Sequence, residues 1–394
     1  MRFEFATATR IIFGRGTIQE VGPLAAEMGN SAFVVTGSST KRAGPLLEQL
    51  DKYKIKHVTF NVTGEPTTTI VKEAVEKARR NKPDLVIGIG GGSVLDTGKV
   101  IAALLTNTGT LEEYLEVVGE GKPIKQSPVP YIAVPTTAGT GAEVTRNAVI
   151  GVPEHKVKVS MRSPLMLPRV AVVDPELTYS MPPTLTASTG LDALTQLIEA
   201  YVSNKANPLT DGICREGIKR AGHSLRKAYE DSSSEAARED MALASLFSGL
   251  ALANAGLGAV HGFAGPLGGM ISAPHGVICA RFLPFVMRVN VGVLKTRQAD
   301  SPYLIRYDEV AQLLTGKAKA QASDGVVWIQ ELCERLKVPS LTGFGLKEQD
   351  FPEVVAKAQK SSSMKGNPIQ LTDNELMEIL QNCLECGRGK SQIV

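Results

Sequence analysis

The sequence predicts a two-domain protein: an α/β Rossmann-like domain over residues 1–180, followed by an all-helical domain over residues 181–394. Short β-branched runs alternate with amphipathic helical patterns in the first half, which is typical of a parallel sheet covered by helices. Strand-like runs become scarce after Asp174, where long helical patterns take over. The length of 394 residues fits two or three domains with an ample core.

Five short apolar runs in the first half are interpreted as strands. The N-terminal segment MRFEFATATRIIFG also alternates like a strand, and IVKEAVEKARRN between two of the runs predicts a helix over Ile70–Asn81. The runs are almost wholly apolar, as expected for strands buried on both faces. They are Ala32–Thr36, Lys56–Phe60, Leu85–Ile89, Tyr131–Val134 and Val170–Val173.

The second half begins after a proline-rich connection, and we place the domain boundary near residue 180. A stretch without Asp, Glu, Lys or Arg runs from Met241 to Ala280, but Gly, Ala, Ser and Pro dilute it. It therefore predicts buried helices of a soluble core, with no membrane span. The helical patterns cover Leu185–Ser203, Asp211–Tyr229, Ala236–Ala255, Leu304–Leu314, Gly325–Leu336 and Asp373–Glu385.

Composition excludes several classes of partner and compartment. The 43 Lys and Arg against 40 Asp and Glu leave a net charge of +3, without a footprint for nucleic acid or an anionic membrane. An N-terminal signal is not evident, and five scattered cysteines fit a reducing cytoplasm. Cys383 and Cys386 form a C-x-x-C pattern, interpreted as two neighbours on a last helix, with a redox pair or half a metal site as the alternative.

Two glycine-rich turns follow predicted strands. Gly88–Ser93 (GIGGGS) directly precedes a helical pattern, and free N–H groups at a helix start favour an anion such as pyrophosphate. Ser93 stands where the dinucleotide pattern G-x-G-x-x-G has its last glycine, so the alternative is a tight structural turn. Thr136–Gly141 (TTAGTG) follows the next predicted strand. Both turns are expected at the carboxyl edge of one sheet.

A candidate metal site lies in the helical half. Asp192 and Gln196 are four residues apart on a predicted helix and share one face, while His261 and His275 fall in the uncharged stretch. A carboxylate and two imidazoles suit a divalent ion, and the alternative is a pair of hydrogen-bonded core histidines. The other histidines, which receive no role, are His57, His155 and His223.

Five ordered motifs across nearly the whole chain resemble the iron-containing (group III) alcohol dehydrogenases. They are GGGSVLDTGK, PTTAGTGAEVT, LPRVAVVDPELT, TGLDALTQLIEAYVS and HGFAGPLGGMISAPHG. The resemblance implies the dehydroquinate synthase-like architecture, catalysis in the cleft between the domains, and a homodimer or higher homo-oligomer. It is specific for the superfamily and much less specific for a substrate.

The resemblance also implies the residues of the metal site. Asp192, His261 and His275 match three of four family ligands and would be the catalytic residues, with Fe²⁺ as the first expectation and Zn²⁺ as the second. Gln196 stands where the family has His, as a weak neutral fourth donor. Gly265 stands where a second family His lies near the nicotinamide, so we expect the proton to pass through water and ribose hydroxyls instead.

The cofactor site follows from the same resemblance. One group would hold the pyrophosphate and neighbouring ribose: Gly90, Gly91, Gly92, Ser93 and Asp96. Thr136, Thr137 and Thr140 would line the cofactor site, and Lys158 would reach the nicotinamide ribose. NAD-preferring relatives often carry Asp at the position of Gly37. In this chain the hydroxyl groups of Ser38 and Ser39 and the cations Lys41 and Arg42 follow Gly37, which favours NADP over NAD. The alternative is that the two cations only solvate the start of a helix.

These features together predict an NAD(P)-dependent, metal-dependent alcohol dehydrogenase, working also as an aldehyde or ketone reductase by hydride transfer on a small-molecule alcohol or aldehyde. One alternative is a metal-independent reductase of the same superfamily, similar to the maleylacetate reductases. The other is a non-catalytic relative that binds nucleotide as a structural ligand, which the changes at Gln196 and Gly265 would favour.

Overall fold

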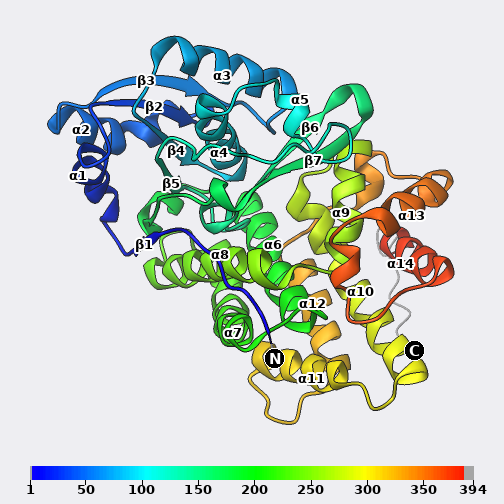
Figure 1. The fold of residues 1–394 in the computed structure, drawn as a ribbon. Helices are drawn as coiled ribbons and strands as arrows, with labels where there is room; N and C mark the ends of the chain where they lie inside the picture. Colours follow the sequence, from blue (N-terminus) through cyan, green and yellow to red (C-terminus); the bar gives the residue numbers. More distant parts are fainter. Residues whose placement is uncertain (1, 386–394) are drawn as a thin grey trace. The chain divides into compact units, whose positions relative to one another are not determined.

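The computed structural model describes residues 2–385 and divides them into two compact units (Figure 1). One unit covers Ala6–Met181, and the other begins at Pro182 and also includes the residues before Ala6. The first is a parallel α/β unit and the second is helical, so the predicted fold class is confirmed. Cys383 is buried near the end of the last helix, whereas Cys386 lies outside the described residues.

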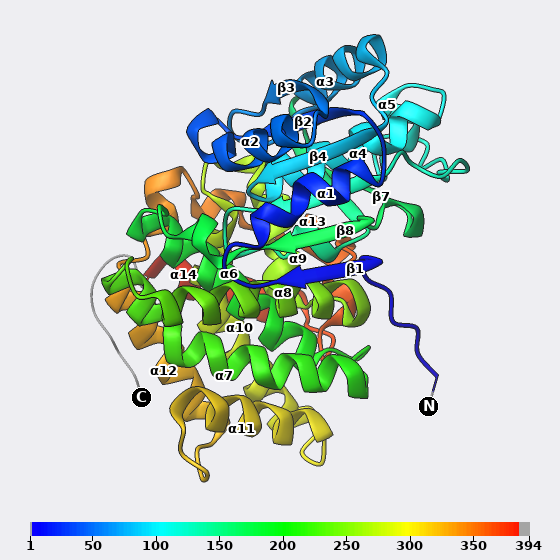
Figure 2. The same cartoon turned by 90° about the vertical axis from the view of Figure 1, so that its left-hand side faces the viewer.

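Six parallel strands form the sheet of the first unit in the order β1-β8-β5-β4-β2-β3 (Figure 2). Five of them coincide with the predicted runs to within a residue or two, and β1 lies in the N-terminal alternating segment. Chain order reverses between β2 and β4, because β3 is added on one side of β2 and β4 on the other. The strands are β1 (Arg10–Phe13), β2 (Ser31–Thr36), β3 (Lys56–Asn61), β4 (Leu85–Gly90), β5 (Tyr131–Pro135) and β8 (Val170–Val173).

Helices cover both faces of this sheet, which explains the almost continuous apolar runs of the strands. Along β4, Leu85 and Ile87 pack in the cluster that includes α1 and α2, whereas Val86 packs in the cluster that includes α3 and α4. The side chains therefore alternate between two buried layers. The helices of this unit are α1 (Val21–Ala26), α2 (Gly44–Lys52), α3 (Thr68–Asn81), α4 (Gly92–Thr106) and α5 (Leu111–Tyr114).

An antiparallel hairpin that the sequence did not predict follows β5. It consists of β6 (Asn147–Val152) and β7 (Val157–Arg162) and forms a second, two-stranded sheet. Its strands mix buried and exposed positions, and the connection PEH carries none of the usual two-residue hairpin signals.

The buried ammonium group of Lys99 ties α4 to this hairpin. Lys99 Nζ donates to Asp96 Oδ1 at 3.1 Å, to Thr145 Oγ1 at 2.8 Å and to the carbonyl oxygen of Asn147 at 2.7 Å. The other carboxylate oxygen of Asp96 accepts from the backbone N–H of Val149 at 2.9 Å. Lys99 is only 1% exposed, and three oxygens compensate the desolvation of its charge.

The second unit consists of long helices, as the sequence predicts. The axis bends by 99° between α8 and α9, and the uncharged stretch forms α9, the end of α8 and the start of α10. Among the described residues, α10 is the single helix long and apolar enough to cross a membrane, and 83% of that apolar window is buried, as in a core helix. The helices are α6 (Pro183–Val202), α7 (Pro208–Glu230), α8 (Glu235–Ala255), α9 (Ala259–Met270), α10 (His275–Arg297), α11 (Pro302–Thr315), α12 (Ala322–Arg335), α13 (Phe351–Lys360) and α14 (Asp373–Glu385).

The hydrogen bonds of the Lys99 ammonium group predict that removing this side chain causes a large loss of stability. Lys99→Ala leaves the half-buried carboxylate of Asp96 and the oxygens of Thr145 and Asn147 without the ammonium group, and we expect the free energy of unfolding to fall by about 3 kcal/mol. Urea denaturation followed by circular dichroism measures it. The control is Lys72→Ala, which removes an exposed ion pair with Glu112 and should cost under ~1 kcal/mol. Equal losses in the two variants would contradict the assignment.

Candidate active site

The predicted nucleotide turns lie at the carboxyl ends of three adjacent strands. Gly37 follows β2, Gly91 follows β4 and Thr136 follows β5, and these strands are neighbours in the sheet. The chain order reverses between β2 and β4, and a parallel sheet binds nucleotides at such a reversal. The topology thus brings the three turns to one edge of the first unit.

The glycines of the first turn allow the second turn to pack directly against it. The backbone N–H of Thr136 donates to the carbonyl oxygen of Gly90 at 2.9 Å. A Cβ atom on Gly92 would lie 2.9 Å from Thr140 Oγ1, and one on Gly91 would lie 3.4 Å from the Thr137 side chain. The turn leads into the first turn of α4, whose N–H groups precede the intrahelical bonds and attract an anion.

Two further predicted cofactor residues have protein partners. Asp96 bonds Lys99 and Val149, as described above. Lys158 Nζ, on β7, lies 2.5 Å from Glu65 Oε2, and its side chain is 12% exposed. Their roles toward a cofactor stay predictions.

The residues that follow β2 are open to solvent. Ser38, Ser39 and Lys41 are exposed, and Arg42 Nη2 donates to the carbonyl oxygen of Ser180 at 3.5 Å. Lys41 is therefore accessible beside the end of β2, as recognition of a 2′-phosphate would require, whereas Arg42 is half-buried.

Three helices of the second unit bring the predicted metal residues together. Asp192 comes from α6, His261 from the first turn of α9, and His275 is the first residue of α10. Asp192 Oδ1 lies 3.4 Å from His261 Nε2 and 3.8 Å from His275 Nε2. Cys279, one turn beyond His275, completes a group of four donor atoms that all lie within 4.8 Å of one another.

Gln196 lies beside this cluster and holds its carboxylate. Its Nε2 donates to Asp192 Oδ2 at 3.3 Å, which leaves Oδ1 toward the two imidazoles. Asp192 Oδ1 and Gln196 Oε1 are both buried without a hydrogen-bond partner. Buried polar atoms rarely lack a partner, and two such oxygens beside two imidazoles fit a bound cation. The donor set therefore suits a divalent metal.

Glu199 contacts the candidate metal cluster, and the sequence analysis missed it. Its carboxylate accepts from His261 Nδ1 at 2.5 Å and from the backbone N–H of Val260 at 2.7 Å. A carboxylate on the far nitrogen of a metal-binding imidazole fixes its tautomer and raises its basicity. The signal was available, because Glu199 lies seven residues after Asp192 and shares the same face of α6.

Charges in the cluster shift the pKa values in opposite directions. Burial favours neutral Asp192, yet His275 and His261 hold the pKa of this carboxyl below its usual value. Burial likewise opposes the charge on His261, but the acidic groups around it raise the pKa of the imidazole well above 6.5. Burial raises the pKa of the Cys279 thiol to about 12. Without a metal ion, the imidazole of His261 thus carries a positive charge beside the carboxylates of Asp192 and Glu199.

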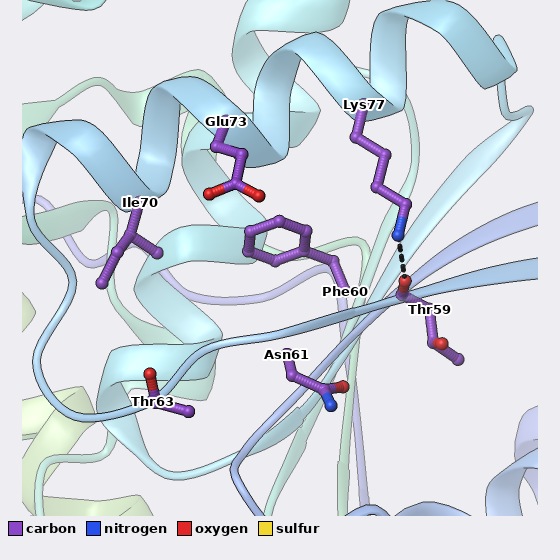
Figure 3. A pocket seen from close by; sticks show the side chains of 7 residues that line it. All are labelled: Thr59, Phe60, Asn61, Thr63, Ile70, Glu73 and Lys77. Carbon is purple, nitrogen blue, oxygen red and sulfur yellow. Dashed lines mark hydrogen bonds between the residues drawn. The ribbon is translucent and has the colours of Figure 1, made fainter.

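A pocket of about 440 Å³ lies elsewhere in the first unit, between the edge strand β3 and α3 (Figure 3). The side chain of Lys77 reaches from α3 to β3, where its Nζ donates to the carbonyl oxygen of Thr59 at 3.0 Å. No predicted site residue lines this pocket, whose walls are Thr59, Phe60, Asn61, Thr63, Ile70, Glu73 and Lys77.

Comparison with known proteins decides the family. Residues 8–175 match the family model of iron-containing alcohol dehydrogenase, and residues 186–384 match the C-terminal model of the Fe-containing alcohol dehydrogenase family. The chain belongs to the iron-containing alcohol dehydrogenases. Alcohol dehydrogenase 4 of Saccharomyces cerevisiae (strain ATCC 204508 / S288c) is 33% identical over 379 residues, covering 95% of this chain and 96% of that one.

Solved structures agree with this assignment. The structure of a 1,3-propanediol oxidoreductase superposes with a TM-score of 0.89 at 34% identity, covering 97% of this chain and 100% of that one. A sulfoacetaldehyde reductase from Bifidobacterium kashiwanohense in complex with NAD⁺ gives a TM-score of 0.86 at 30% identity, covering 98% and 99%. Within this iron-containing alcohol dehydrogenase, the predicted metal residues lie in the C-terminal family region and the predicted nucleotide turns lie in the N-terminal one.

Buried Glu143, just after the second nucleotide turn, predicts a pH dependence of stability. Burial raises its pKa to about 7 from 4.5, although Lys99 opposes this. The folded chain therefore binds the proton more tightly than the unfolded chain, so the free energy of unfolding should fall as pH rises from about 4.5 to about 7.

The variant Glu143→Gln should remove this fall, of about 3 kcal/mol, from urea titrations across that pH range. The matched control is Glu73→Gln at an exposed position of α3, which should retain it. If Glu143→Gln keeps the fall unchanged, the assignment of the titrating group is wrong.

Proposed function

We propose that this protein is an NAD(P)-dependent alcohol dehydrogenase that uses a divalent metal to interconvert a small alcohol and the corresponding aldehyde or ketone. Membership in the iron-containing family supports the reaction class and the use of a metal. The observation that carries the proposal is the buried, unpartnered oxygen of Asp192, which faces two imidazoles. This oxygen also argues against the metal-independent alternative, because without a metal ion it has no hydrogen-bond partner.

Residues of the helical unit would bind the metal and orient its ligands. Asp192, His261 and His275 would hold the ion, Glu199 orients His261 through Nδ1, and Gln196 orients Asp192 through Oδ2. When bound, the ion supplies a Lewis acid for the oxygen of the alcohol or carbonyl substrate. His275 is the most accessible member, with 34% of its side chain exposed, so substrate access on its side is expected.

The proton route is expected to be solvent-based. Gly265 stands on α9 where the family resemblance expects an imidazole, and a Cβ built there meets nothing within 4 Å. Space of this kind accommodates water, which would carry the proton to or from the substrate hydroxyl.

Cofactor binding would fall to the turns of the sheet unit. The glycine turn and the start of α4 would hold the pyrophosphate. We further propose a preference for NADP over NAD, supported by the acid-free segment after Gly37 and its exposed hydroxyls and cations. The chain is expected to act in the cytoplasm and as a homodimer or higher homo-oligomer.

The metal proposal predicts a joint loss of ion and activity. His275→Ala removes one ligand, and we expect metal content to fall and kcat/KM for alcohol oxidation to drop at least ~100-fold. Elemental analysis and steady-state kinetics measure the two effects. His223→Ala, an exposed histidine of α7, is the matched control and should change neither. Full activity in His275→Ala, or in chelated wild-type protein, would refute the metal-dependent mechanism.

The nucleotide proposal predicts a switch of cofactor preference. Gly37→Asp places a carboxylate beside the end of β2, where a side chain has room because the nearest atom to its Cβ is 3.9 Å away. The charge should repel a 2′-phosphate and accept from a 2′-hydroxyl, lowering the NADPH/NADH ratio of kcat/KM by roughly 10-fold or more. An unchanged ratio would show that this segment does not face the adenosine ribose.

A further inference from the structure

We propose that Cys279 is a fourth protein ligand of the metal held by Asp192, His261 and His275, in the position left open by the replacement of an imidazole by Gln196. This inference rests on the proposed function, because it concerns the same ion. It changes the donor set expected from the sequence, one carboxylate, two imidazoles and the amide of Gln196, to one carboxylate, two imidazoles and one thiolate.

Donor distances carry the proposal. Cys279 Sγ lies 3.7 Å from His261 Nε2 and 3.6 Å from His275 Nε2. A tetrahedral ion with bonds of ~2.1 Å to nitrogen or oxygen and ~2.3 Å to sulfur holds adjacent donors roughly 3.4–3.6 Å apart. The contacts of Asp192 Oδ1 with the imidazoles, 3.4 and 3.8 Å, are close to the same spacing. Four edges of a coordination tetrahedron are therefore nearly preformed.

Local structure explains why the thiol reaches the cluster. Cys279 follows His275 by four residues on α10, so both side chains lie on one face of the helix. A Cβ on Gly276 would lie 2.2 Å from the carbonyl oxygen of Ser188, so glycine allows the start of α10 to approach α6 this closely. Cys279 is fully buried, which places the thiol inside the cluster.

Gln196 is the competing fourth donor, and the thiol is the better one. The amide nitrogen of Gln196 is bonded to Asp192 Oδ2, and its amide oxygen, buried without a hydrogen-bond partner, is the atom that competes with the thiol. A neutral amide oxygen is also a weaker ligand for Zn²⁺ or Co²⁺ than a thiolate. On binding, the S–H bond of Cys279 breaks, an S–metal bond forms and the proton leaves to solvent. No electron is transferred.

Cobalt substitution tests the proposal directly. Wild-type protein stripped with a chelator and loaded anaerobically with Co²⁺ should show an intense near-ultraviolet band from thiolate-to-cobalt charge transfer. Cys279→Ser should still bind Co²⁺ but lose this band, with at least ~10-fold weaker affinity. The matched control is Cys214→Ser, a buried cysteine of α7, which should keep band and affinity.

Metal content separates failure of this proposal from failure of the proposed function. If wild type binds cobalt stoichiometrically without the band, or if Cys279→Ser keeps the band, Cys279 is not a ligand while the metal site stands. If Asp192→Ala binds cobalt as well as wild type, the metal site is elsewhere and both proposals fall.

X-ray absorption of zinc-loaded wild type needs no variant and tests the ligand set even if Cys279→Ser does not fold. The proposal requires a sulfur scatterer at ~2.3 Å from the metal. A first shell of nitrogen and oxygen alone overturns it.

Discussion

The geometry of the candidate metal cluster depends on the two hydrogen bonds that the carboxylate of Glu199 accepts. One of its oxygens accepts from the backbone N–H of Val260 and the other from His261 Nδ1, so it fixes the start of α9 and the imidazole together. Its negative charge also complements the positive end of the helix dipole. A Cβ on Gly258 would lie 2.9 Å from Glu199 Oε1, so a larger residue there would displace the carboxylate from its position. His261 Nε2 is consequently left facing Asp192.

Helix α6 acts as the common support of the site because its polar residues recur at helical spacing. Asp192, Gln196 and Glu199 lie on one face and are buried, and α6 has no charged residue besides Asp192 and Glu199. Sequence reasoning found the first two, together with His261 and His275, because carboxylate, amide and imidazole stand out in uncharged surroundings. Glu199 and Cys279 went unnoticed: a helical glutamate usually faces solvent, and a lone cysteine usually fills a core. Only the packing of α9 and α10 against α6 shows their neighbours.

In the sheet unit, most of the architecture could be predicted because parallel strands buried on both faces have an unmistakable composition. The nucleotide turns were predicted for the same reason, since glycines at strand ends permit close approach of backbone. The hairpin β6–β7 was not, because its half-exposed strands lack a clear pattern. Asp96 shows a different limit: its place in the motif suggested the cofactor, whereas both of its oxygens have partners within the unit.

The central claim is that a divalent ion binds where the oxygen of Asp192 faces the imidazoles of His261 and His275. Anomalous diffraction from crystals of the metal-loaded protein, recorded on both sides of the metal absorption edge, locates such an ion without assumptions about activity. The account predicts a single strong peak per chain within ~2.3 Å of Asp192 Oδ1, His261 Nε2 and His275 Nε2. A peak at any other residues, or no peak in crystals whose protein turns over substrate, would contradict it.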